Sequence, residues 1–201
     1  TIGDAHLEYL GNREGVLRAK AEIVSGMPPS GVVIVNGDDA LLRKHDFGMR
    51  VIRFGITEEC EIMARDIDFL GEKGIDCTIV IDRRQIRVHI PAVGKHLIYA
   101  ALAAAAVGTE MGLTDAEIRN GIAAYETVGS RGRILHIGNI TLLDDCYNAN
   151  PTSMKAALDT LVSLPGRHIA VLGDMLELGP ESVSMHRSVG DRKSTRLNSS
   201  H

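Results

Sequence analysis

The stretch ITLLDDCYNANPTSM, residues 140–154, constrains the fold most, because it joins an apolar run, a polar turn and a helix start. Residues 140–143 are mainly apolar and predict a buried strand, which two consecutive aspartates end. Asn150 followed by Pro151 predicts a helix cap with proline at the first helical position. Carboxylates at the end of a strand can accept hydrogen bonds from sugar hydroxyls, and the N–H groups of a helix start can bind an anion. The turn is therefore either a ligand site or a plain capped turn with solvated aspartates.

Composition narrows the classes of protein and partner. With 201 residues, 44% of them hydrophobic, the chain can form one large or two small domains. A net charge of −4, 3% aromatic residues and no Trp argue against a nucleic-acid partner. The three cysteines are widely spaced without a CxxC pair, which indicates a reducing compartment and no zinc site. The longest apolar run, residues 97–107, is too short for a membrane span, and the N-terminus lacks a signal pattern. We therefore expect a cytoplasmic protein.

The first part of the chain predicts an α/β domain. Residues 31–36, GVVIVN, form a continuous apolar run typical of a strand buried on both faces. Later strands alternate more loosely, which predicts an antiparallel meander with one solvated face. We therefore expect a mostly parallel sheet with a small antiparallel addition. The predicted helices are 14–24, 95–111 and 115–125, the last with Thr114 as its cap, and the predicted strands are 31–36, 51–54, 61–69, 76–81 and 85–90.

A second α/β domain is predicted after the glycine-rich, basic segment 128–133. We expect a hairpin of residues 133–137 and 140–143, then a helix over 152–164 and a buried strand over 168–172. GDMLELG, residues 173–179, follows that strand where open α/β sheets place ligands. From Asp191 the chain is polar without an apolar period, and we expect 191–201 to be a non-native tail.

The order of these segments resembles the Mur ligases over about residues 1–190. The resemblance rests on IGDAHLEYLG (2–11), GVLRAKAEI (15–23), GKH with the alanine-rich helix (94–106), DDCYNANPTSM (144–154) and VLGDMLELG (171–179). It implies that residues 1–127 are the C-terminal part of the central ATP-binding domain. Residues 128–190 would then be the N-terminal part of a Rossmann-like C-terminal ligase domain. The YNAN segment favours the members that add D-alanyl-D-alanine.

The resemblance also implies two sets of site residues. His6 matches a histidine that binds Mg²⁺, and Lys20 matches a lysine that is carbamylated and places a second Mg²⁺ near the transferred phosphate. Without the resemblance, a lone histidine and a helix lysine would be read as structural and solvated residues. Arg131 matches an arginine that reaches the phosphates, although Arg133 competes for this role. Lys20 and Arg131 are therefore the expected catalytic residues.

The expected nucleotide-binding residues lie mainly in the turn. Asp145 matches the aspartate that holds the ATP ribose, and the others are Asn148, Asn150 and His96. Leu97 and Ala100 stand where the family has asparagines, the second of which contacts adenine. This departure leaves adenine recognition open.

The implied reaction is acyl-phosphate ligation. ATP phosphorylates the terminal carboxylate of UDP-MurNAc-tripeptide, and the amine of D-Ala-D-Ala attacks the acyl phosphate. No GxxxxGK[ST] loop occurs in these 201 residues, so we expect an internal fragment of an enzyme that is inactive by itself. We expect the whole enzyme to be a monomer. The alternatives are a sister Mur ligase, a folylpolyglutamate synthase-like enzyme, and a non-catalytic binding protein on the same scaffold.

Overall fold

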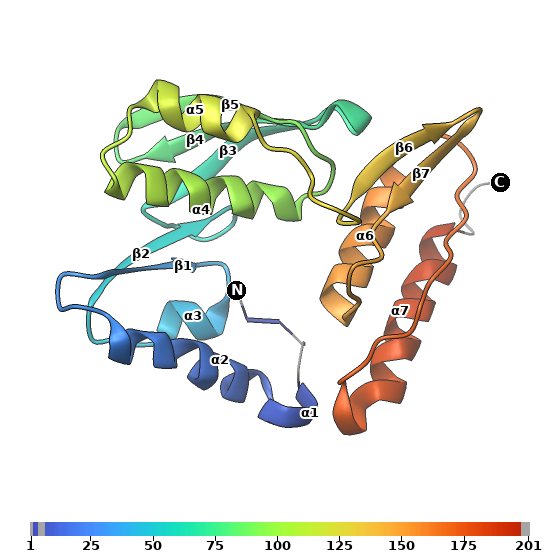
Figure 1. Cartoon of the computed structure of the whole chain (residues 1–201), viewed down its shortest axis with the longest axis horizontal. Helices are drawn as coiled ribbons and strands as arrows, with labels where there is room; N and C mark the ends of the chain where they lie inside the picture. Colours follow the sequence, from blue (N-terminus) through green and yellow to red (C-terminus); the bar gives the residue numbers. More distant parts are fainter. Residues whose placement is uncertain (1, 4–6, 198–201) are drawn as a thin grey trace. The chain divides into compact units, whose positions relative to one another are not determined.

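The computed structural model describes residues 2–3 and 7–197, and their contacts divide the chain into two compact units (Figure 1). The first unit is essentially Glu14–Tyr125, and the second comprises Gly3–Arg13 and the chain from Glu126 onward. The contacts thus separate Tyr125 from Glu126, whereas the sequence predicts a boundary at 127/128. The assignment of 1–127, 128–190 and 191–201 as separate parts stays a prediction.

A five-stranded mixed sheet forms the centre of the first unit. Its strands follow the order β1-β2-β3-β4-β5; β1, β2 and β3 pair in parallel, and β3, β4 and β5 pair antiparallel. This confirms the predicted mixed α/β sheet. The elements of this part are α2 (Arg13–Ala21), η1 (Glu22–Gly26), β1 (Val32–Asn36), α3 (Ala40–Lys44), β2 (Arg50–Gly55), β3 (Ile62–Phe69), η2 (Gly71–Lys73), β4 (Ile75–Ile81), β5 (Arg84–Ile90), α4 (His96–Glu110) and α5 (Asp115–Ala123).

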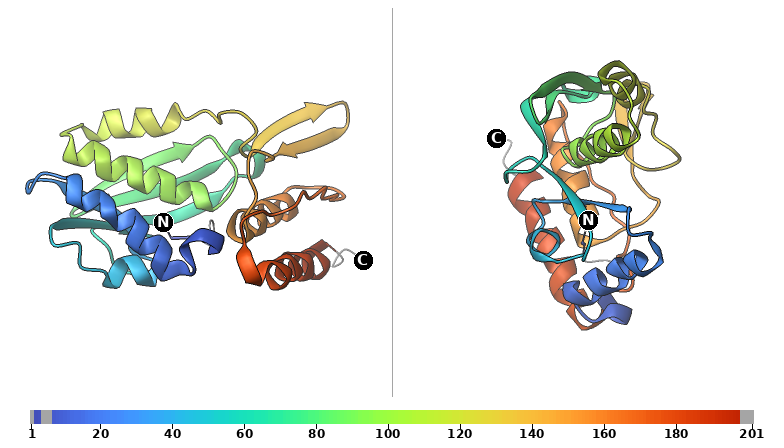
Figure 2. Two further views of the ribbon diagram at one scale, coloured as in Figure 1. Left: turned by 60° about the horizontal axis from the view of Figure 1, so that its bottom comes forward. Right: turned by 90° about the vertical axis from the view of Figure 1, so that its left-hand side faces the viewer.

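Helices α4 and α5 cover one face of this sheet, as the side views also show (Figure 2). Ile98, Leu102 and Ala105 of α4 are fully buried against strand residues that include Ile79 and Ile86. The alanines of α4 have short side chains, so the helix can lie close to several strands at once. The apolar core of the unit therefore lies between these helices and the sheet.

Local signals set the ends of the elements. Thr114 caps α5 as predicted: its hydroxyl accepts from the N–H of Glu117, whose carboxylate accepts from the N–H of Thr114. Before β4, Gly74 has φ of 102°, and a Cβ there would lie 2.1 Å from the carbonyl oxygen of Ile90. Only glycine fits this close approach. The predicted helix 14–24 is shorter in the structure, because α2 ends at Ala21 and continues as the 3₁₀ turn η1.

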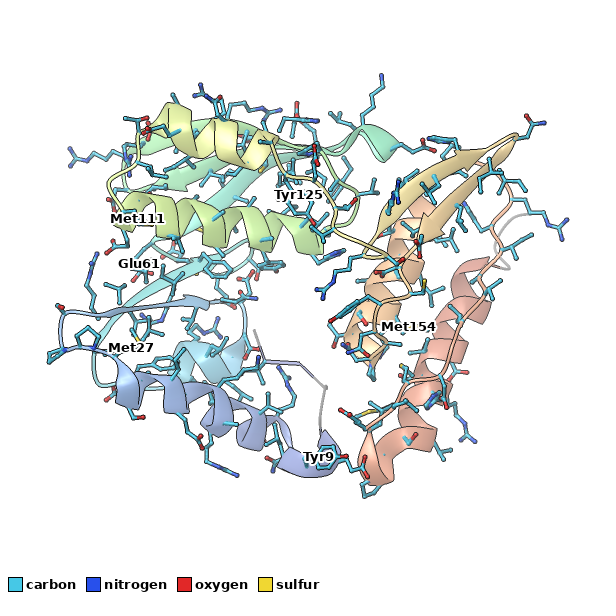
Figure 3. All side chains as sticks on the ribbon, viewed as in Figure 1. Tyr9, Met27, Glu61, Met111, Tyr125 and Met154 are labelled. Atoms are coloured by element: carbon cyan, nitrogen blue, oxygen red, sulfur yellow. The ribbon has the colours of Figure 1, made fainter. Side chains whose placement is uncertain are left out.

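The second unit contains a hairpin and two longer helices. Its elements are α1 (Leu7–Leu10), β6 (Arg133–Ile137), β7 (Ile140–Asp144), α6 (Pro151–Ser163), η3 (Gly179–Glu181) and α7 (Ser182–Leu197). β6 and β7 pair antiparallel around Gly138-Asn139, as predicted. Leu158 of α6 packs with Met175, Leu178 and Val189, and Met154, labelled in Figure 3, packs against this cluster.

Two predictions for this unit are wrong. Residues 168–172 form no strand, and Val171 is 96% exposed. The predicted buried strand over 140–143 is β7, but Ile140 and Leu142 on it are exposed. A buried strand needs neighbours on its edges and cover on its faces, and among the described residues β6 and β7 pair only with each other. The predicted parallel crossover is therefore absent from the described chain.

The backbone of α7 continues through Leu197, into the segment expected to be a non-native tail. Of the helices that the structure describes, none has the length and apolar character needed to cross a membrane.

Candidate functional site

The predicted turn joins β7 to α6 in the second unit, and its last residue caps the helix. Oδ1 of Asn150 accepts from the N–H of Ser153 at 2.9 Å, and Oγ of Ser153 accepts from the N–H of Asn150 at 3.1 Å. Pro151 occupies the first turn of α6, as predicted. The amide oxygen of Asn150 is thus engaged by the helix, which leaves its NH₂ group for a ligand.

The two aspartates of the turn have different surroundings. Sγ of Cys146 donates to Oδ1 of Asp144 at 2.8 Å, and this bond together with one from Ser130 holds the pKa of Asp144 below its usual value. The same carboxylate raises the pKa of the Cys146 thiol, which therefore stays protonated near neutral pH. Asp145 is exposed, and none of the described residues forms a hydrogen bond to its carboxylate. Asp145 is the aspartate that can accept a ligand's hydroxyl groups.

Arg131 and Tyr147 meet beside this turn. The Cζ atom of Arg131 lies 3.7 Å from the centroid of the Tyr147 ring, and the N–H of Tyr147 donates to the carbonyl of Ser130 at 3.2 Å. Arg133, the competing arginine, is on β6 directly opposite Asp144, and its charge contributes to the low pKa of that carboxyl. The structure thus brings Arg131 to the turn that carries Asp145, whereas Arg133 lies opposite Asp144 in the hairpin.

The other predicted residues lie elsewhere. Lys20 is exposed in the last turn of α2, and His96 is the exposed first residue of α4. Both belong to the first unit. Asn148 is exposed in the second unit, with its Oδ1 accepting from the N–H of Ala149 at 2.8 Å. His6 lies outside the described residues. Within the described part of the chain, no group of three or more His, Cys, Asp or Glu side chains could hold a metal ion.

Asp38 carries a structural carboxylate that the sequence patterns did not single out. The Asp38 carboxylate accepts from the N–H groups of Ile56 and Glu58 at 2.8 and 2.9 Å, from Thr57, and from the hydroxyl of Tyr99 at 2.9 Å. Burial raises the pKa of Asp38, but these hydrogen bonds outweigh burial and lower the pKa to about 2. One carboxylate thereby joins the carboxyl ends of β1 and β2 to the first turn of α4.

Tyr99 is the link from this carboxylate to a predicted site residue. Burial raises the pKa of Tyr99 to about 12, and its hydrogen bond to Asp38 acts in the same direction. His96 precedes Tyr99 by one helical turn on α4. The available signal was the pair Asp38-Asp39, which only Gly37 separates from the predicted buried strand 31–36, much as Asp144-Asp145 follow the apolar run 140–143.

Comparisons with known proteins agree on one family. The chain matches the Mur ligase middle domain over residues 1–108 and the Mur ligase glutamate ligase domain over residues 130–197. Two similar curated proteins are UDP-N-acetylmuramoyl-tripeptide–D-alanyl-D-alanine ligases. The Bacillus subtilis protein is 34% identical over 94% of this chain and 41% of its own length. The Escherichia coli protein is 38% identical over 94% of this chain and 43% of its own length.

Solved structures give the same result. MurF from Acinetobacter baumannii superimposes with a TM-score of 0.89 at 32% identity, over 96% of this chain and 43% of its own. MurF from Thermotoga maritima in complex with ADP gives a TM-score of 0.85 at 25% identity, over 97% of this chain and 45% of its own. The chain therefore spans less than half the length of these relatives.

Proposed function

Because this chain belongs to the Mur ligase family, we propose that it is part of an ATP-dependent ligase that joins D-alanyl-D-alanine to UDP-MurNAc-tripeptide in peptidoglycan synthesis. The observation that carries this proposal is the turn after β7: it holds an exposed Asp145, and its Tyr147 ring contacts Arg131, in a chain whose curated relatives bear the name of that activity. A reaction that consumes ATP and a UDP-linked substrate fits the cytoplasm, where we propose that the protein acts as a monomer.

The residues of the turn suit a nucleotide. The Asp145 carboxylate is free to accept hydrogen bonds from ribose hydroxyls, and Asn148 and Asn150 offer amide groups on the same segment. The Arg131 guanidinium would bind phosphate oxygens, for which its planar set of donors is well shaped. Bound ATP supplies the phosphoryl group that activates the tripeptide carboxylate, and the role of these side chains is to hold and orient it.

For the first unit we propose two roles. Lys20 would be carbamylated, since an ammonium group repels Mg²⁺ whereas a carbamate offers it oxygen ligands. Its exposed position on α2 leaves the amine accessible to dissolved CO₂. Together with His6, which lies outside the described residues, it would hold Mg²⁺ at the phosphates. His96 would contact the nucleotide from the start of α4, whose Leu97 and Ala100 replace the family's asparagines.

The test uses the complete reading frame of the gene. We expect phosphate release from ATP that requires both UDP-MurNAc-tripeptide and D-Ala-D-Ala, and we expect none from the 201-residue chain alone. Asp145→Asn would raise the KM for ATP, whereas Asp82→Asn, a change at another exposed aspartate outside the turn, would not. Preference for a single amino acid over D-Ala-D-Ala would instead indicate a sister ligase.

A further inference from the structure

The contact between Arg131 and Tyr147 is built into the turn by the backbone around it. The N–H of Tyr147 donates to the carbonyl of Ser130, the residue directly before Arg131. Asp144 reinforces this connection, because its carboxylate accepts hydrogen bonds from both Ser130 and Cys146. The segment that carries Arg131 is thus joined to the turn that carries Tyr147 through the preceding residue, Ser130.

The ring of Tyr147 is the partner of the Arg131 side chain. The Cζ atom of Arg131 lies over the ring, 3.7 Å from its centroid. At this distance an edge-on guanidinium would bring a nitrogen atom too close to the ring, so the planar group lies across the ring face. No carboxylate among the described residues forms an ion pair with Arg131. The negative face of the aromatic ring therefore holds this cation without using its N–H donors.

We propose that Tyr147 is a positioning residue of the ligase, whose ring holds the Arg131 guanidinium in place for the phosphates of the nucleotide. This inference rests on the proposed function and adds to it a residue that itself contacts no reacting atom. Stacking leaves the N–H edges of the guanidinium directed outward, where they can form charge-assisted hydrogen bonds to phosphate oxygens.

Tyr147 would act by restricting the conformations of Arg131. A free arginine side chain samples many rotamers, and binding a phosphate must then fix all of them. A stacked guanidinium at an exposed site has lost part of this freedom before the ligand arrives. From the usual strength of exposed cation–π contacts, we expect removal of the ring to weaken nucleotide binding about two- to fivefold.

The first experiment tests the stacking in the 201-residue chain and requires no activity. In proton NMR spectra, the ring current of Tyr147 should shift the side-chain signals of Arg131 upfield. Tyr147→Leu should remove this shift, and Tyr147→Phe should keep it. Tyr9→Leu, a change at a tyrosine that is 74% exposed compared with 68% for Tyr147, should leave it unaltered. Equal Arg131 shifts in the wild type and in Tyr147→Leu would overturn the proposal.

The second experiment measures the KM for ATP in the complete ligase, with Tyr147→Leu made in the wild type and in an Arg131→Ala background. In the wild-type background we expect Tyr147→Leu to raise the KM for ATP two- to fivefold, and Tyr147→Phe to give a lower KM than Tyr147→Leu. In the Arg131→Ala background we expect Tyr147→Leu to cause no further rise in KM. A merely structural tyrosine would give the same loss in both backgrounds, which would refute the positioning role while the ligase function stands. If the wild-type enzyme showed no ligation of D-Ala-D-Ala, the proposed function would be refuted instead. The NMR result would still decide whether Arg131 stacks on Tyr147.

Discussion

The Asp38 carboxylate holds three segments of the first unit together, and replacing Asp38 by asparagine puts a neutral amide in its place. In the wild type this carboxylate accepts backbone N–H bonds from residues 56–58 and hydroxyl bonds from Thr57 and Tyr99. Asparagine can place only one oxygen there, and its NH₂ group would face N–H donors. The space is also tight, since a Cβ at Gly55 would lie 2.8 Å from Oδ1 of Asp38.

The size of the effect follows from the pKa of this group. A fall in the pKa of Asp38 from 3.8 to about 2 corresponds to roughly 2.5 kcal/mol of stabilisation of the charged form. Because the side chain is only partly buried, solvent screening reduces this figure, and we expect Asp38→Asn to lower the free energy of unfolding of the first unit by about 1–2 kcal/mol at pH 7.

The pH dependence has a defined sign. The folded-state pKa is lower than the unfolded one, so the contribution is fully present above about pH 4 and is lost as the pH falls towards 2. Urea unfolding of the two proteins, followed through amide signals of β2 and β4, measures the difference at pH 7 and at intervals down to pH 2. The stability difference that comes from the charge should shrink across that window.

Asp82→Asn provides the matched control. Asp82 is an exposed aspartate with φ of 54°, a backbone conformation that asparagine tolerates equally well. The control should therefore unfold like the wild type. An Asp38→Asn protein whose stability equals that of the wild type at pH 7, or whose deficit is unchanged between pH 5 and pH 2, would refute the reasoning.

Three further predictions concern single side chains. The backbone carbonyl of Ser182 and the carboxylate of Asp174 raise the pKa of His186. The contribution of His186 to stability should therefore be complete at low pH and lost as the pH rises through the raised pKa. In urea titrations, His186→Gln should destabilise the second unit at pH 5.5 but have little effect at pH 8.5. Asn150→Ala removes the cap of α6 and should cost about 1 kcal/mol, measured by urea unfolding, with Asn139→Ala in the hairpin turn as the comparison. Leu102→Ala leaves a cavity beneath α4 and should cost about 2–5 kcal/mol by the same method.

The sequence predicted those parts of the fold whose signals are local. Strand β1 follows from a continuous β-branched run, and the starts of α5 and α6 follow from Thr114 and Asn150, whose caps form within three residues. Residues 168–172 show where this reasoning ends. Their apolar residues predict a strand, but a strand forms only if another pairs with it, and composition carries no information about that partner.

The site was predictable to a similar extent. Family resemblance selected Arg131 and Asp145, and Asn150 was evident from helix-capping rules alone. Asp38 could not be found in this way, because its partners lie 18 to 61 positions further along the chain and come together only in the folded sheet. The contact of Arg131 with Tyr147 likewise depends on the loop before β6 meeting the turn after β7.

We expect the mixed sheet of the first unit to divide into a fast and a slow half during folding. Strands β3, β4 and β5 are consecutive in the chain and joined by short turns, so their pairing closes loops of only a few residues. The parallel pairing of β1 with β2 must wait until the intervening segment with α3 has crossed over. Hairpins form within about 1–10 μs, whereas longer-range pairings form more slowly because their loop-closure entropy is larger. We therefore expect the meander of β3, β4 and β5 to form first, and β2 and then β1 to pair with it afterwards.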